Sequence, residues 1–144
     1  MVGDANAGLT AYPGRVNPTL GPLSPFFIVK DLRRAARFYV DRLGFDVRFQ
    51  EPPDEPFFAI VGRGHAQLFL KEIGEGIEAQ PNPTRHAWAP WDAYVETPDP
   101  DALAAELERR GATFHAPLSN RDDGLRGFEV RDEDGYVLFF GRPA

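Results

Sequence analysis

The 144-residue chain contains no cysteine and only three histidines. The lack of cysteine excludes a disulfide framework, a thiolate metal site and a cysteine nucleophile, and it is compatible with a reducing compartment. The longest apolar runs, residues 25–29 and 137–140, are far shorter than the roughly 20 residues that a membrane helix needs. The N-terminal residues lack the basic opening and apolar stretch of a signal peptide. We therefore expect a soluble, cytoplasmic protein with no membrane partner.

The chain also has few basic residues for its length. Lys and Arg number 16 against 22 Asp and Glu, so the formal net charge is −6. The electrostatic field of this negative charge repels phosphate backbones, and the sequence has no Lys/Arg cluster that would offset it. We therefore expect no nucleic-acid partner. Phenylalanine is abundant, with 12 residues, and an aromatic core of this kind is well suited to form the walls of an apolar cavity.

The chain repeats one pattern of strand, helix and strands, with an offset near seventy residues. A short apolar strand ends before Asp31, which is a good helix N-cap, and the amphipathic helix that follows stops at Gly44. The pattern returns with Asp99 as N-cap, Pro100 at the first helical position and a stop at Gly111. We interpret the chain as one duplicated domain, divided into a flexible N-terminal arm (1–23), a first module (24–73), an inter-module loop (74–90) and a second module (91–144).

Two segments carry a resemblance to a known family. They are Val29-Lys-Asp-Leu with Ala36-Arg-Phe-Tyr-Val-Asp-Arg-Leu-Gly-Phe, and Val130-Arg-Asp-Glu-Asp-Gly-Tyr-Val-Leu-Phe-Phe-Gly. The chain resembles the vicinal oxygen chelate superfamily, which includes glyoxalase I, extradiol dioxygenases and bleomycin resistance proteins. The resemblance implies an α+β fold in which two βαβββ modules form a curled, eight-stranded mixed sheet around a cup-shaped cleft, with helices outside. It also implies a homodimer.

In the metal-dependent members of this family, four ligands face into the cup, one from the first strand and one from the last strand of each module. When the family's four ligand positions are aligned with this sequence, they hold residues that cannot bind a divalent ion, namely Ser24, Leu68, Pro90 and Phe139. Zn²⁺, Ni²⁺ or Fe²⁺ would need three or four converging N, O or S donors. A one-residue slip could bring Gln67 or Asp92 into place, but it would also turn their neighbours to the wrong face. We therefore expect neither a metal site nor a cofactor.

Strand alternation gives the side chains that would line the cup instead. On the first strand, Phe27 and Val29 are expected in the core; on the fifth, Trp91, Ala93 and Val95 are expected there. Leu70 and Val137 would complete the apolar lining. The candidate ligand-binding residues are Phe26, Ile28, Leu68, Trp88, Asp92, Tyr94, Glu96 and Phe139.

An aromatic wall with a few acidic groups suits a small hydrophobic or cationic compound. The sequence therefore favours a metal-free binding protein of the bleomycin-resistance type, for which no reaction is required. Glu96 could instead lie at the strand rim in water, and Tyr94 and Trp88 could pack in the core or at a dimer contact. Two alternatives stay open: a divalent-metal-dependent lyase, isomerase or dioxygenase with displaced ligands, and a non-catalytic scaffold or regulatory domain.

Overall fold

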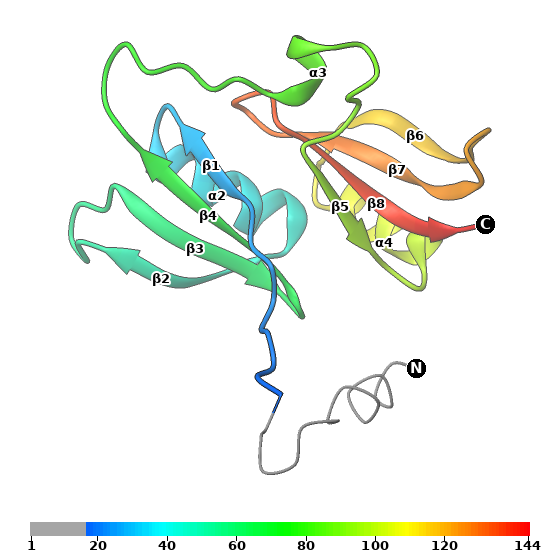
Figure 1. The fold of residues 1–144 in the computed structure, drawn as a ribbon, viewed down its shortest axis with the longest axis horizontal. Helices are drawn as coiled ribbons and strands as arrows, with labels where there is room; N and C mark the ends of the chain where they lie inside the picture. The colour runs from blue at the N-terminus through cyan, green and yellow to red at the C-terminus, as the bar shows by residue number, and fades with distance from the viewer. Residues whose placement is uncertain (1–16) are drawn as a thin grey trace.

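The computed structural model describes residues 17–144. Within these residues, eight strands and three helices follow one another in two similar blocks (Figure 1). In chain order they are β1 (Phe26–Val29), α2 (Leu32–Leu43), β2 (Asp46–Glu51), β3 (Phe58–Arg63), β4 (Ala66–Glu72), α3 (Asn82–Arg85), β5 (Ala93–Glu96), α4 (Pro100–Arg109), β6 (Phe114–Asn120), β7 (Leu125–Arg131) and β8 (Val137–Pro143).

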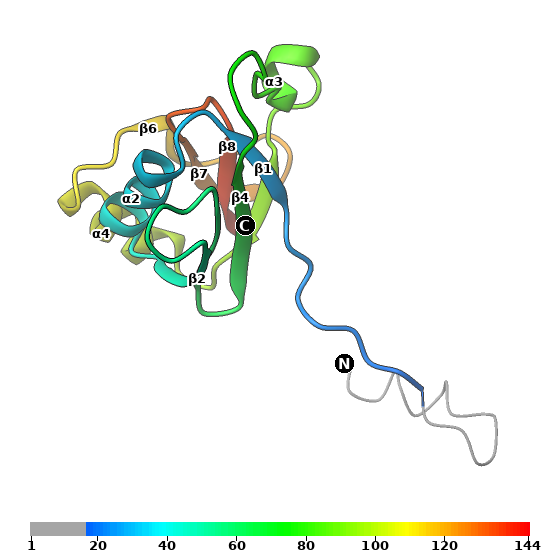
Figure 2. The same ribbon diagram turned by 90° about the vertical axis from the view of Figure 1, so that its left-hand side faces the viewer.

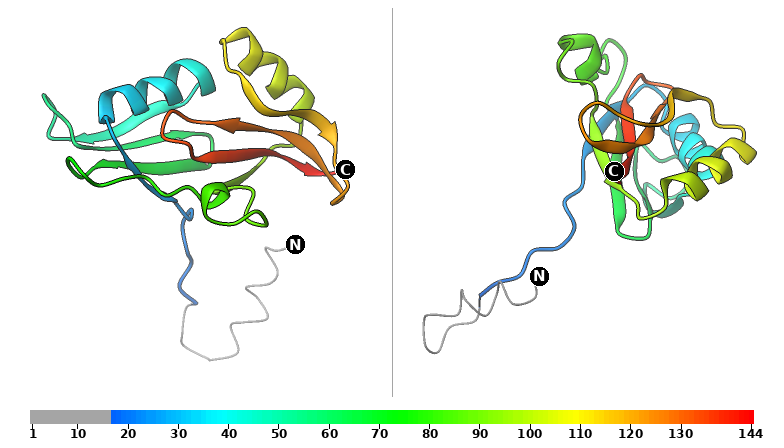
Figure 3. Two further views of the ribbon diagram at one scale, coloured as in Figure 1. Left: turned by 90° about the horizontal axis from the view of Figure 1, so that it is seen from above. Right: turned by 90° about the vertical axis from the view of Figure 1, so that its right-hand side faces the viewer.

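The strands form two four-stranded sheets of identical topology, β1-β4-β3-β2 and β5-β8-β7-β6. In the first sheet β1 is parallel to β4, and in the second sheet β5 is parallel to β8. All other neighbouring strands are antiparallel. Seen from above, α2 and α4 cover the same side of the two sheets, whereas α3 lies on the other side (Figure 3). The predicted α+β class and the two βαβββ modules are confirmed. Each sheet therefore has one face that neither α2 nor α4 covers, and we call this the helix-free face.

The helix boundaries follow from capping residues that the sequence indicated. The Asp31 side chain accepts a hydrogen bond from the Arg34 amide, and Gly44 ends α2 in the left-handed conformation at φ 71°. The Asp99 side chain accepts from the Ala102 amide, and Pro100 opens α4. The short helix α3 was not expected, because its sequence has no apolar periodicity and it lies within the loop that we predicted.

The hydrophobic core fills the space between the helices and the covered faces of the two sheets. Phe27 and Val29 lie in it as expected. Leu68 and Leu70, which we expected to line the cup, also belong to the core, with exposed fractions of 2% and 0%. The expected alternation on β4 was wrong by one residue, because Phe69 rather than Leu68 pairs with Phe26 on the helix-free face.

The hairpin turns join the two modules by reaching across to the opposite helix. Arg63, at the end of β3, forms a two-bond ion pair with Glu106 of α4, with N–O distances of 2.7 and 3.0 Å. Asp132, directly after β7, accepts a hydrogen bond of 2.6 Å from the buried Tyr39 hydroxyl of α2. The Tyr136 ring also stacks on Phe27 at 4.0 Å. These contacts hold the sheets side by side.

Residues 17–25 contain no helix or strand and run away from the sheets (Figure 2). Leu20 and Leu23 are almost fully exposed there. The N-terminal arm was predicted to be flexible over residues 1–23. Most of these residues lie outside the described range. No helix among the described residues is long and apolar enough to cross a membrane.

Candidate ligand-binding site

Each helix-free face carries a row of four side chains, one from each strand, at equivalent positions. Residues paired in register lie on the same face of a sheet. We call these sets the first row and the second row. The first row is Phe26, Phe69, Ile60 and Phe49, and the second row is Tyr94, Phe139, Glu129 and Ala116.

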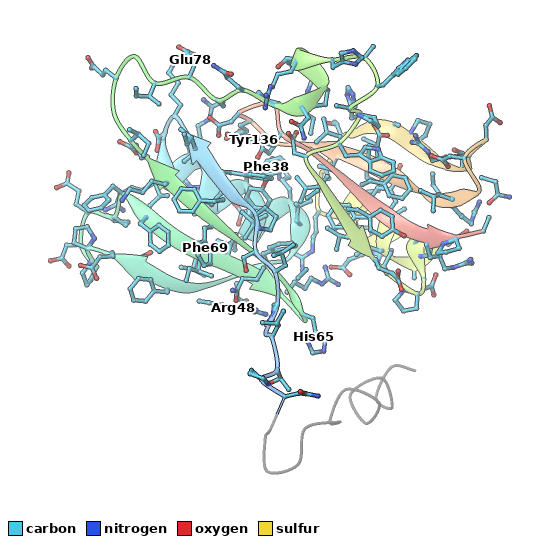
Figure 4. The ribbon with its side chains drawn as sticks, viewed as in Figure 1. Phe38, Arg48, His65, Phe69, Glu78 and Tyr136 are labelled. Carbon is cyan, nitrogen blue, oxygen red and sulfur yellow. The ribbon has the colours of Figure 1, made fainter. Side chains whose placement is uncertain are left out.

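The first row is apolar and partly open to solvent. Phe58 lies beside it, and its ring centroid is 5.5 Å from that of Phe69 and 6.2 Å from that of Phe49. Phe26 contacts the Phe69 ring edge-on at 6.1 Å, and Figure 4 shows Phe69 on the β4 side of this sheet. Phe26 is 58% exposed and Phe49 is 48% exposed. Rings of this size are rarely left open without a partner surface.

The second row has the same geometry, but its central ring is covered. Phe139 is fully buried beneath Trp91, stacked at 4.6 Å, and Tyr94, stacked at 5.6 Å. A Cβ atom at Gly127 or Gly141 would collide with the Phe139 ring. These two glycines therefore let the ring lie close to the sheet. Trp91, which we expected in the core, packs on the helix-free face instead.

A buried carboxylate lies beside this stack. Glu129 is 6% exposed and accepts hydrogen bonds through Oε2 from Trp91 Nε1 at 2.8 Å and from Arg121 Nη1 at 2.7 Å. The Arg121 guanidinium carbon lies 5.1 Å from the Phe139 ring centroid and 5.4 Å from that of Trp91, within cation–π range. Desolvation, followed by the Glu96 carboxylate, raises the pKa of Tyr94 above its ordinary value of 10.0.

A cavity of about 780 Å³ lies between β1 and the inter-module loop. Phe26 and Ile28 line its apolar side, and Glu78 and Asp92 line its acidic side. Figure 4 shows Glu78 on the loop at the upper edge of the molecule. The structure thus brings three of the predicted residues, Phe26, Ile28 and Asp92, to one cavity of the size that small ligands occupy.

The other predicted residues are dispersed. Tyr94 and Glu96 line a second cavity of about 300 Å³ at the seam between the modules, where Leu68 reaches its wall from the core. Phe139 lies under the Trp91 and Tyr94 rings. Trp88 is 90% exposed and contacts only the ring of His86 among the aromatic side chains of residues 17–144. Contact of these residues with a ligand stays a prediction.

The positions at which the family's enzymes hold a metal can now be assigned from strand pairing. Phe69 and Phe139 occupy equivalent last-strand positions, and Asp92 rather than Pro90 is equivalent to Ser24, because both precede their N-cap by seven residues. The Asp92 carboxylate is already bonded, through Oδ1 to the Asn82 amide and through Oδ2 to the Val137 amide. Within residues 17–144, no three His, Asp or Glu side chains come together as a metal site. This set of donors does not fit a divalent ion.

The fold defines a class of paired βαβββ proteins in which each sheet has one helix-free face. The chain belongs to the Glyoxalase/Bleomycin resistance protein/Dioxygenase superfamily, whose family profile matches residues 19–140. No curated protein matches the chain.

Solved structures with the same fold include proteins described as antibiotic binders. The bleomycin-binding protein of bleomycin-producing Streptomyces verticillus, in complex with copper(II)-bleomycin, is 27% identical with a TM-score of 0.63, covering 90% of this chain and 100% of that one. TioX from Micromonospora sp. ML1 is 21% identical with a TM-score of 0.67, covering 87% and 100%. TnmS3, an antibiotic binding protein from Streptomyces sp. CB03234, is 22% identical with a TM-score of 0.61, covering 88% and 100%.

Several residues of the two rows were not predicted. Phe69 was missed because the alternation of its strand was assigned from the wrong residue, and Phe49 was missed because no facing was assigned to the strand that contains it. The facing of Glu129 could have been predicted from the sequence. A single acid between Phe128 and Val130 in a strand must face away from the core that those two neighbours occupy. Arg121 left no such signal, because it lies just after β6 and its position depends on how the chain turns into β7.

Proposed function

We propose that this protein binds a small hydrophobic or cationic compound without a metal, on the helix-free side of its sheets. One observation carries the proposal: the two last-strand positions that hold metal ligands in the family's enzymes are occupied by Phe69 and Phe139, at the centre of two aromatic rows. Aromatic walls bind planar or apolar ligands and offer nothing to a metal ion.

The acidic groups of the larger cavity favour a positively charged ligand. Glu78 lines it together with the exposed Phe26. An amine in this cavity would gain from the carboxylate and from the ring face together. Asp92 contributes less, because its oxygens are already bonded to backbone amides.

We also propose a homodimer in which the helix-free faces are covered. Phe26, Phe49 and Tyr94 are exposed by 41% or more on this side of the molecule. Large exposed aromatic groups on one side are typical of interaction surfaces. A second copy would turn two open faces into an enclosed cleft. The proposal keeps the cytoplasm as the compartment that we expected from the sequence.

Metal analysis and a thermal-shift screen test the proposal together. Protein dialysed against EDTA is screened with bleomycin-type glycopeptides and aromatic amines, and a ligand at 100 times its Kd should add roughly 2.7 kcal/mol of stability. Stoichiometric Ni, Zn, Fe or Mn that survives dialysis would favour the metal-dependent enzyme instead. A complete lack of response to every compound would leave the scaffold function.

A further inference from the structure

The strongest unexplained feature of the candidate site is Arg121, a charged residue that covers aromatic rings on the second helix-free face. Its guanidinium lies over both Trp91 and Phe139. Its side chain is 25% exposed, whereas that of its partner Glu129 is only 8% exposed. The guanidinium is therefore held at the boundary between the buried stack and the solvent.

Two of the three guanidinium nitrogens are already bonded. Nη1 donates to Glu129 at 2.7 Å, and Nε donates to Asp123 at 3.2 Å. Within residues 17–144, Nη2 donates to no acceptor. A planar guanidinium with one unoccupied donor edge can hold an acceptor in a fixed plane. Because Glu129 also binds Trp91 Nε1, the same carboxylate orients the donor and the ring beside it.

The local charges decide which acceptor fits. Arg121 contributes one positive charge, and Glu129 and Asp123 contribute two negative charges, so the cluster carries a net charge of about −1. An anionic ligand would be repelled by both carboxylates. A cationic ligand would face the guanidinium that already occupies the cation–π position over Trp91 and Phe139. A neutral ligand with a polar acceptor meets neither penalty.

We propose that Arg121 is a specificity-determining residue of this site and selects neutral, planar aromatic ligands that carry a hydrogen-bond acceptor. The ligand ring lies against Trp91 and the exposed Tyr94, and its carbonyl oxygen or ring nitrogen accepts from Arg121 Nη2. This inference rests on the proposed function. It assigns the hydrophobic ligand class to the second row, whereas the acidic cavity beside Phe26 suits a cation.

Four probes of one ring size test this selectivity: naphthalene, 2-naphthamide, 2-naphthoate and 2-naphthylmethylammonium. We expect the EDTA-treated wild-type protein to bind 2-naphthamide about tenfold more tightly than naphthalene, since the amide oxygen gains a hydrogen bond from a charged donor. The naphthoate should bind more weakly than the amide. Equal affinity for the amide, the naphthoate and naphthalene contradicts the role of Arg121 and leaves the proposed function intact.

The variant Arg121→Lys keeps a positive charge for Glu129 but lacks the planar donor edge. We expect it to lose about tenfold in affinity for 2-naphthamide, with naphthalene affinity changed less than about twofold. The exposed Arg109→Lys on α4 is the matched control and should bind all four probes as the wild type does. Unchanged amide affinity in Arg121→Lys overturns the inference. If this variant fails to fold, the order of the probes on the wild type still decides. Wild-type protein that binds none of the four overturns this inference, and the response to the bleomycin-type glycopeptides then decides whether the proposed function falls with it.

Discussion

The two helix-free faces share one framework and differ in chemistry. In the first row, Ile60 pairs with Phe69 between exposed phenylalanines. In the second row, the equivalent position to Ile60 is Glu129, whose carboxylate holds Arg121 and Trp91 around the buried Phe139. The two modules thus share their strand register, while their side chains form one apolar wall and one fixed polar–aromatic wall. A cleft between unlike walls can orient a ligand as well as hold it.

The hairpins show the same divergence at equivalent positions. Arg63 is the last residue of β3 and Asp132 directly follows β7, and each contacts the helix of the other module. The first contact is an ion pair near the surface, and the second is a buried hydrogen bond. The Arg63 and Arg110 side chains lower the pKa of Glu106 to about 2, whereas burial raises that of Asp132 to about 6. The two junctions should therefore respond to pH in opposite directions.

The largest difference between the faces should appear when the central ring of each row is removed. Phe139→Ala should lower the free energy of unfolding by about 3–5 kcal/mol, because the ring is fully buried beneath two others. Phe69→Ala should cost about half as much, because its ring is only partly buried. Urea unfolding of both variants measures the difference, and equal losses would show that the two faces are packed alike.

The next effect concerns pH. The pKa of Asp132 is about 6 in the folded protein against an ordinary value of 3.8, so the folded state binds more protons between these values. The contribution of this group to stability should be fully present below about pH 3.8 and should be lost as the pH rises through about 6, a fall of about 2–3 kcal/mol by pH 7. Urea midpoints at pH 4.5 and 7 measure this change. Asp132→Asn, which can still accept from Tyr39, should flatten the profile; an unchanged slope would assign the effect to other groups.

The Arg63–Glu106 contact should change the stability with pH in the opposite direction. Its pKa is lowered from 4.5 to about 2, so its contribution to stability is present above pH 4.5 and is lost as the pH falls toward 2. Glu106→Gln should therefore remove part of the acid sensitivity below pH 4.5. The exposed Glu108→Gln on the same helix is the control, and acid unfolding midpoints of the two variants provide the comparison. Identical midpoints for the wild type and Glu106→Gln would contradict this assignment.

A smaller effect is expected at the buried carboxylate of the second row. Glu129→Gln keeps an acceptor for Trp91 Nε1 but removes the charge that binds Arg121, and it should cost about 1–2 kcal/mol. Thermal unfolding of Glu129→Gln measures this loss of stability, with Glu78→Gln on the inter-module loop as the control. A loss no greater than that of Glu78→Gln would mean that the Arg121 contact contributes little.

The helix caps should be alike in the two modules. Asp31→Ala and Asp99→Ala each remove one cap hydrogen bond, of 3.1 and 3.0 Å. Each should cost about 1 kcal/mol in urea unfolding. A clear difference between them would show that one module depends on its helix more than the other.

The sequence was sufficient for the framework because caps, glycine stops and strand periodicity are local signals. Asp31 and Asp99 begin the two long helices and Gly44 ends the first of them, whatever the arrangement of the other segments. The site was harder to predict, because the facing of a strand changes completely with a shift of one residue. Leu68 was placed in the cup for this reason, and Phe69 was missed. The Glu129–Arg121–Trp91 cluster joins the β6–β7 hairpin to Trp91, which lies 38 residues from Glu129 along the chain, and no local pattern indicates that they meet.

The central claim is that the aromatic helix-free side binds a small compound without a metal. Its most direct test is a titration of EDTA-treated protein with metal-free bleomycin and with 2-naphthamide, followed by the NMR signal of the Trp91 indole N–H, which is bonded to Glu129. We predict a saturable shift of this signal with at least one of the two, at the same affinity with and without EDTA. A signal that moves only after a divalent metal is added would contradict it.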